Sequence, residues 1–127
     1  MSPQTAAIIY TILSGIIILF QLSLALGAPW GAASMGGKYP GVYPPKMRRV
    51  AVINIFFLAF LALIVLAEAD VAMSAFQSFS HIAIWVVAAF GLISSILNTI
   101  TPSKIERIWA PVALIQLATS LVVALSN

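Results

Sequence analysis

The sequence predicts an all-α, polytopic membrane protein, a four-transmembrane-helix bundle with a long Gly/Pro-rich first loop. Apolar residues make up 62% of the 127 residues and charged residues only 7%, whereas roughly 25% of the residues in a soluble domain are charged. Four long apolar stretches with short separators account for most of the chain. A soluble fold of this length could not bury so much apolar surface, so we expect a single domain, residues 1–127, surrounded by lipid.

The four helices are expected at about residues 4–26, 46–69, 81–98 and 103–125. At about 1.5 Å per residue the first helix would be about 33 Å long, which is enough to cross the hydrocarbon core of a bilayer. The second would begin after Pro44 and Pro45. Proline lacks a backbone N–H, and this loss costs least at a helix start, where the first N–H groups have no partner within the helix. Before the fourth, Thr101 can cap a helix and Ser103 with Glu106 matches a capping box, which indicates a helix start.

The first loop, residues 27–45, holds five of the seven glycines and four of the seven prolines. Proline and glycine at this density cannot continue a helix. The loop also greatly exceeds the ~2–8 residues that usually join neighbouring helices. We expect it to fold back as an ordered cap on one end of the bundle, with the rings of Trp30 and Tyr43 buried at the membrane interface. The alternative is a plain interfacial connector.

The basic residues lie only in the first and third loops or at their edges. They are Lys38, Lys46, Arg48, Arg49, Lys104 and Arg107. The second loop and both tails have no Lys or Arg, so the positive-inside rule places the Gly/Pro loop in the cytoplasm and both termini outside. Because the charges are explained by membrane topology, we expect no nucleic-acid partner.

Each expected helix carries a small or polar stripe, and these stripes have two interpretations. Amides and hydroxyls within a bundle can hold helices together. They can also line a polar pocket that opens to the cytoplasm beneath the Gly/Pro loop, where Gln21, Asn54 and Asn98 lie. The candidate ligand-binding residues are Gln21, Trp30, Asn54, Asn98, Arg107 and Gln116.

The chain has no Cys and one His, so it offers no thiolate ligand and no bis-His haem site within one chain. His81 with Glu68 and Asp70 could bind a metal or relay protons. Their places at helix ends favour solvated charges instead. No catalytic motif is present, and we expect no catalytic residue, metal or cofactor.

Three segments together resemble one family. LALGAPWG (residues 24–31), KYPGVYPPKMR (38–48) and TPSKIERIWAPVAL (101–114) resemble segments of a family of small four-helix bacterial inner-membrane proteins of unknown function. The resemblance implies this architecture, a bacterial source and a location in the cytoplasmic membrane. It implies no activity.

The resulting functional hypothesis is a non-enzymatic integral membrane protein, either an accessory subunit or a binder of a small ligand or lipid. One alternative is an oligomeric small transporter or channel, although no charge at the membrane midplane is present to carry ions. The other is a membrane enzyme that acts on a lipid or quinone headgroup, with basic residues gripping phosphate. The expected partners are membrane lipid and a homo-oligomer or larger membrane complex.

Overall fold

The computed structural model describes residues 1–126, which form four long helices and no strand. The helices are α1 (Pro3–Ala25), α2 (Pro45–Glu68), α3 (Gln77–Ile100) and α4 (Trp109–Leu125). With the short 3₁₀ turns before α3 and α4, they give segments of 20 to 27 residues whose most apolar parts have a mean hydropathy of 2.0 to 3.0. All four are long and apolar enough to span a membrane, so the predicted fold class is confirmed.

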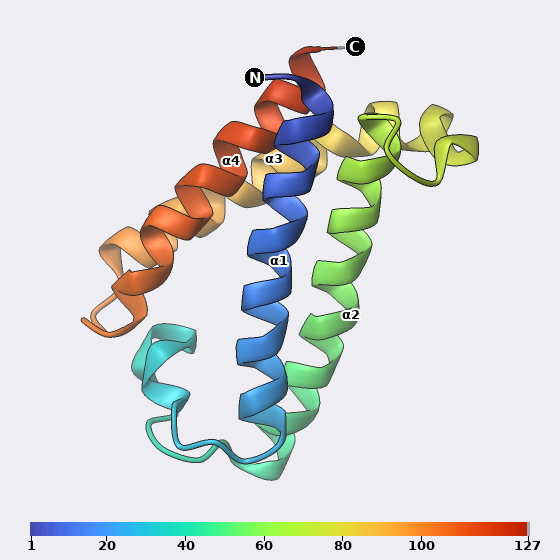
Figure 1. Ribbon diagram of the computed structural model, residues 1–127. Helices are drawn as coiled ribbons and strands as arrows, with labels where there is room; N and C mark the ends of the chain where they lie inside the picture. Colours follow the sequence, from blue (N-terminus) through green and yellow to red (C-terminus); the bar gives the residue numbers. More distant parts are fainter. Residues whose placement is uncertain (127) are drawn as a thin grey trace.

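The helices are arranged as two antiparallel pairs, α1 beside α2 and α3 beside α4 (Figure 1). The two pairs lie close together where the N-terminus and the C-terminal end of α4 lie, which we call the terminal end. The turn 69–76 between α2 and α3 lies at this end as well. The pairs diverge toward the opposite end, the loop end, which holds residues 26–44 and 101–108.

The apolar core follows this divergence. A cluster that includes Tyr10, Val65, Ile84 and Val123, all less than 5% exposed, joins all four helices toward the terminal end. A second, smaller cluster at the loop end joins only α1, α2 and the first loop; its buried members are Leu24, Tyr43, Met47 and Ala51. No buried residue of α3 or α4 belongs to this second cluster, so the four-helix core is continuous only in the terminal half.

The starts of the first two helices follow from their sequence. The Ser2 hydroxyl accepts a hydrogen bond from the Thr5 N–H (3.1 Å) and caps α1, with Pro3 at the first helical position. α2 begins at Pro45 directly after Pro44. Proline is tolerated in these places because the first N–H groups of a helix have no partner within the helix.

α3 is longer at both ends than the expected range 81–98. It begins at Gln77, after the 3₁₀ turn Ser74–Phe76, and ends at Ile100. The polar residues at its start indicated a loop, but the Gln77 amide donates to the Ala67 carbonyl (3.2 Å). This hydrogen bond satisfies a C-terminal carbonyl of α2 and holds the first turn of α3 against it.

α4 begins at Trp109, later than the expected residue 103. Ser103 Oγ does accept from the Glu106 N–H (3.4 Å), as in a capping box. The Glu106 carboxylate, however, accepts from the Thr101 hydroxyl and the Gly36 N–H. Only the 3₁₀ turn Glu106–Ile108 follows directly, because this carboxylate connects the turn to the first loop.

Candidate functional site

The first loop has a defined internal structure. Two 3₁₀ turns, Gly31–Ala33 and Met35–Gly37, form its middle. Its two halves are joined by the Gly31 N–H, which donates to the Gly41 carbonyl (2.9 Å), and by a hydrogen bond between the hydroxyls of Ser34 and Tyr43. Burial raises the pKa of the Tyr43 phenol; the negative charge of Glu106 raises it further, while the Ser34 hydrogen bond lowers it.

The loop is docked by three side chains, two from the turn between α3 and α4 and one from the first residue of α4. Both Glu106 carboxylate oxygens accept from the Gly36 N–H (3.1 and 3.3 Å). The Ser103 hydroxyl donates to the Ala32 carbonyl (2.5 Å), and the Trp109 indole donates to the Ala33 carbonyl (3.0 Å). The loop is therefore a folded cap that connects the two helix pairs where their cores have separated.

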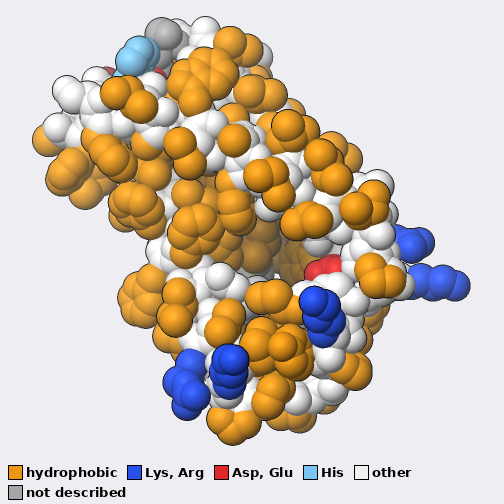
Figure 2. Space-filling view, turned by 180° about the vertical axis from the view of Figure 1, so that it is seen from behind, with side chains coloured by type: hydrophobic (Ala, Val, Ile, Leu, Met, Phe, Trp, Pro, Cys, Tyr) orange, Lys and Arg blue, Asp and Glu red, His pale blue; other side chains and the backbone are white. Residues whose placement is uncertain are grey.

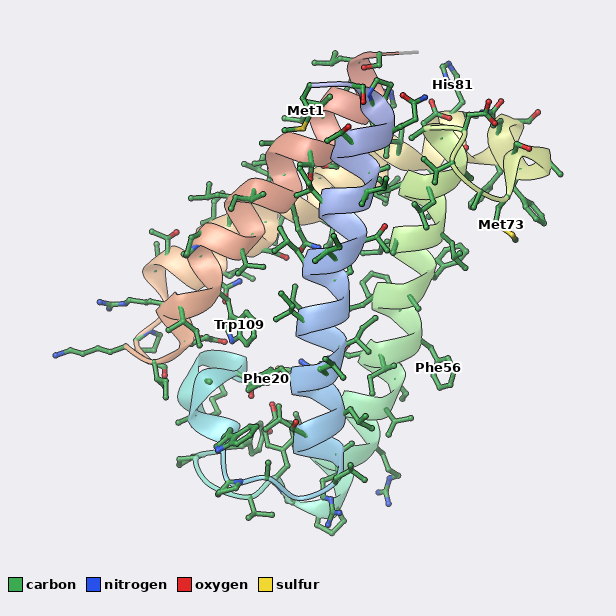
Figure 3. The ribbon with its side chains drawn as sticks, in the orientation of Figure 1. Met1, Phe20, Phe56, Met73, His81 and Trp109 are labelled. Carbon is green, nitrogen blue, oxygen red and sulfur yellow. The ribbon has the colours of Figure 1, made fainter. Side chains whose placement is uncertain are left out.

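Trp109 closes one side of the space beneath this cap. Its ring lies 4.9 Å from the Phe20 ring of α1 (Figure 3). Of the two aromatic residues expected to be buried in the loop, Tyr43 is only 2% exposed, whereas Trp30 is 53% exposed. The expected seat of Trp30 is therefore not formed, and Trp109 is the indole that packs beneath the loop.

A hollow opens on the opposite face, between the spanning helices and the loop end (Figure 2). Between α2 and α3 the rings of Phe57 and Phe90 meet, 5.2 Å apart. Toward the loop end α2 and α3 are no longer joined by buried side chains. The space between them opens sideways. In a bundle that spans a membrane, this side faces the lipid bilayer.

Three polar residues lie on helix faces that lead into this hollow. Asn54 and Ser94 are each one turn from the Phe57–Phe90 contact toward the loop end, and therefore on the faces where α2 and α3 separate. Gln21 lies seven positions after Ser14, whose hydroxyl contacts α4, and so occupies the same face of α1. The half-buried amides of Gln21 and Asn54 have no hydrogen-bond partner within residues 1–126.

Three of the other expected site residues have hydrogen-bond partners within the protein. The buried Gln116 amide donates to the Tyr10 carbonyl (3.2 Å) and to Ser14 Oγ (2.8 Å), so it joins α4 to α1. Asn98 donates to the Ser94 carbonyl of its own helix (2.7 Å). Arg107 is exposed and donates to the Thr101 carbonyl (3.2 Å). Of the candidates in the spanning helices, Gln21 and Asn54 are the two whose amides make no hydrogen bond within residues 1–126.

Lys and Arg side chains surround the loop end and are absent from the terminal end (Figure 2). Arg48 also has a structural role, because its Nε donates to the Ala25 carbonyl at the end of α1 (2.8 Å). An acidic side chain lies at the rim of the hollow among these cations. The hollow thus combines apolar walls, unpaired amides and a cationic rim.

Sequence reasoning did not identify the residues that dock the cap. In the sequence, Ser103 and Glu106 indicate only a helix-capping pair. The partners of the docking residues are backbone groups of Ala32, Ala33 and Gly36. A backbone partner about seventy residues away leaves no side-chain signal in the sequence; the excess length and glycine content of the loop were the available signal.

A separate polar group lies at the terminal end. The Glu68 carboxylate, 3% exposed, accepts from the Ser80 hydroxyl (3.0 Å) and lies 2.9 Å from His81 Nδ1. Asp70 is exposed and has a left-handed backbone (φ 60°). Glu68 and His81 therefore meet, but the expectation of solvated charges is wrong for Glu68, which is buried. Residues 1–126 contain no group of three His, Cys, Asp or Glu placed to hold a metal.

Comparison of the chain with protein-family models, with curated proteins and with solved structures finds no match. The class of the protein therefore rests on its own fold. Its four helices define an all-α, multi-pass membrane protein, a four-helix bundle with a capped loop end.

Proposed function

We propose that this chain is a non-enzymatic integral membrane protein of the bacterial cytoplasmic membrane that binds an anionic membrane lipid in the hollow beneath its loop. The observation that carries the proposal is the pair of unpaired amides, Gln21 of α1 and Asn54 of α2, in the helix pair that diverges from α3 and α4. An amide left without a partner in a lipid environment costs roughly 2–7 kcal/mol. A lipid headgroup or the water around it would supply the missing hydrogen bonds.

The geometry of the hollow supports an amphiphile over a small polar ligand. The rings of Phe57 and Phe90 meet between α2 and α3, and the side of the hollow is open toward the surrounding membrane. An acyl chain can therefore leave the hollow without crossing protein. The headgroup would lie toward the loop end, close to the cationic rim, where anionic lipids are favoured by electrostatic attraction.

Two features favour binding over catalysis on a headgroup. The chain has one His, and His81 pairs with Glu68 at the terminal end, far along the helices from the hollow. The acid at the loop end, Glu106, is engaged by Gly36 and Thr101 in holding the cap. A general base is thus not positioned beside the amides.

A matched pair of substitutions tests the proposal. Ser94→Trp places a large ring in the hollow, whereas Ile93→Trp places it on the neighbouring exposed face, where Ile93 is 56% exposed. The purified variants are analysed by native mass spectrometry after mild delipidation. We expect Ile93→Trp and the unmodified chain to retain a phospholipid of the anionic class and Ser94→Trp to lose it. Equal retention by both variants would contradict lipid binding in the hollow.

A second comparison tests the charge of the headgroup. Lys38 and Arg107 flank residues that dock the cap on the α3–α4 turn, so Lys38→Gln/Arg107→Gln lowers the charge there. Lys46→Gln/Arg49→Gln removes the same charge from the first turn of α2. In nanodiscs with equal phosphatidylglycerol and phosphatidylcholine, we expect the first pair to reduce the share of retained phosphatidylglycerol more than the second. No selectivity in the unmodified chain would refute an anionic headgroup.

A further inference from the structure

An apolar groove of about 330 Å³ lies at the terminal end, between α2 and the start of α3. Its walls include Phe60 of α2, Phe76 of the 3₁₀ turn and Phe79 of α3, with the rings of Phe60 and Phe79 6.2 Å apart. Met73, which has a left-handed backbone (φ 57°), projects from the turn 69–76 beside them (Figure 3). The groove is separate from the hollow beneath the loop, at the other end of the helices.

Ser80 is the one polar side chain among the residues that line this groove, and it is 1% exposed. Its hydroxyl donates to Glu68 Oε1 (3.0 Å), and the Gln77 carbonyl is a second acceptor at 3.3 Å. A serine hydroxyl has one proton and two lone pairs. Since the proton is directed at these acceptors, Ser80 can present only an acceptor to a molecule in the groove.

The charge behind this acceptor is negative. The Glu68 carboxylate is 3% exposed and has His81 Nδ1 2.9 Å from its other oxygen. All six Lys and Arg residues lie toward the opposite end, in or beside the first and third loops. The remaining acid of this end, Asp70, lies two residues after Glu68 and is exposed, so water screens its charge. With the His81 imidazole neutral, the Glu68 carboxylate therefore favours positive charge at the polar end of the groove.

We propose that this groove binds a lipophilic cation, with its apolar groups against the three phenylalanines and its positive charge toward Ser80 and Glu68. Aromatic faces attract cations through the ring quadrupole, and the attraction is stronger where water is excluded. A neutral acyl chain gains the same apolar contact, but it leaves the Ser80 acceptor and the field of Glu68 unused. The aromatic walls and the buried carboxylate together therefore select for charge as well as for apolar surface.

Radiolabelled tetraphenylphosphonium is a suitable probe, because its charge is permanent and its surface is aromatic. Binding is measured on the full chain in phosphatidylcholine nanodiscs, with empty nanodiscs subtracted to remove partitioning into lipid. We expect saturable binding to one site. Glu68→Gln should weaken it at least about tenfold, because a unit charge in a partly desolvated site is only weakly screened. Asp70→Asn is the matched control: it removes a negative charge at an exposed neighbouring position and should change binding less than twofold, since an exposed charge is well screened.

Two further measurements keep the inference testable if Glu68→Gln proves unstable. Leu63→Trp fills the groove from α2 and should abolish binding, while Ser94→Trp in the hollow should leave it unchanged. The neutral analogue triphenylphosphine oxide should compete poorly with the cation. Equal competition by this analogue, or unchanged binding in a folded Glu68→Gln variant, would show a merely apolar groove and overturn the inference. Because Ser94→Trp affects only the proposed lipid site, the two proposals can fail separately.

Discussion

The carboxylate of Glu106 holds the backbone N–H of Gly36 with both oxygens, at 3.1 and 3.3 Å, across seventy residues of sequence. Glu106 belongs to the turn before α4, and Gly36 lies in the middle of the first loop. Gly36 has a left-handed backbone (φ 66°), a conformation that glycine adopts without a steric penalty. This contact joins the α1–α2 pair to the α3–α4 pair at the end where their apolar cores have separated.

Removal of this carboxylate should release the loop. Glu106→Ala leaves the Gly36 N–H and the Thr101 hydroxyl without their acceptor, a loss of about 1–3 kcal/mol for a partly buried charged hydrogen bond. We expect trypsin cleavage after Lys38 to become at least about fivefold faster in inside-out vesicles. Lys104→Ala, an exposed change in the same turn, serves as the control and should cleave at the original rate. Equal rates for all three chains would mean that Glu106 does not hold the loop.

Gly31 is a steric requirement of the cap. A Cβ atom at this position would lie 1.9 Å from the Tyr39 carbonyl oxygen and 2.7 Å from that of Gly41. Both atoms belong to the backbone, so Gly31→Ala must displace the chain. The substitution should lower the free energy of unfolding by about 1–3 kcal/mol or more. The measurement is thermal unfolding of the purified chain in detergent.

Gly15→Ala is the matched control, because a Cβ there meets nothing within 4 Å. In a helix this change should be neutral or stabilising by about 0.5–1 kcal/mol. If Gly31→Ala melts at the same temperature as Gly15→Ala, the close approach of the two halves of the loop is not part of the folded protein.

Gln116 should stabilise the contact between α4 and α1. Its amide donates to Ser14 Oγ (2.8 Å) and to the Tyr10 carbonyl (3.2 Å). Interhelical hydrogen bonds of this kind contribute about 0.6–2 kcal/mol, so Gln116→Leu should lower the free energy of unfolding by about 1 kcal/mol. A double-mutant cycle with Ser14→Ala should show coupling between the two positions, and additive effects would contradict the contact.

Asn54 should behave differently from Gln116, although both are amides in spanning helices. Asn54 has no hydrogen-bond partner within residues 1–126 and faces the hollow. In detergent without bound lipid, water solvates the open amide, so Asn54→Leu should change the free energy of unfolding by less than about 0.5 kcal/mol, as expected for a change that breaks no contact within the protein. A loss as large as that of Gln116→Leu would show that Asn54 is a packing residue and weaken the proposed lipid site.

The sequence was sufficient to predict the helix count and the long first loop, because length and hydropathy are local properties of each stretch. It was not sufficient to separate Gln116, which joins two helices, from Asn54, which faces the hollow. Both amides lie on polar stripes with the same helical spacing. Their roles differ because the helix pairs diverge, and divergence depends on long-range contacts that no local pattern records.

The helix bounds show a similar limit. Gln77 and Ser78 have the composition of a loop, but Gln77 is helical because its amide bonds the Ala67 carbonyl. Ser103 and Glu106 have the spacing of a helix start, but α4 begins only at Trp109 because the Glu106 carboxylate is taken by the first loop. In each case a tertiary hydrogen bond outweighs the local preference.

The phenol of Tyr43 gives the cap a dependence on alkaline pH. Its pKa in the folded protein is raised above the ordinary value of 10.0, mainly by burial. The folded state therefore holds this proton more tightly than the unfolded state, and the stabilisation is full below pH 10 and lost as the pH rises through the folded pKa.

We expect the melting temperature of the unmodified chain to fall more steeply above pH 10 than that of Tyr43→Phe. The comparison between the two chains removes the contribution of lysines and of the other tyrosines. Parallel profiles would mean that folding does not raise the pKa of the Tyr43 phenol.

Membrane topology is testable by cysteine labelling, because the chain contains no native Cys. Val42, 55% exposed in the first loop, and Ala72, exposed in the turn between α2 and α3, are suitable positions. Ser34 is unsuitable because it is only 7% exposed and bonded to Tyr43. In spheroplasts, a membrane-impermeant maleimide should label Ala72→Cys directly and Val42→Cys only after permeabilisation, since the positive-inside rule places the basic loop in the cytoplasm.

Ile93→Cys, on an exposed apolar face of α3, should remain unlabelled on both sides and marks the background within the bilayer. Labelling of positions 42 and 72 from the same side would exclude an α2 that crosses the membrane. The reverse pattern would keep the four spans but place the cationic rim outside. In that case the hollow would open to the outer leaflet, and the proposed anionic lipid would have to come from that leaflet.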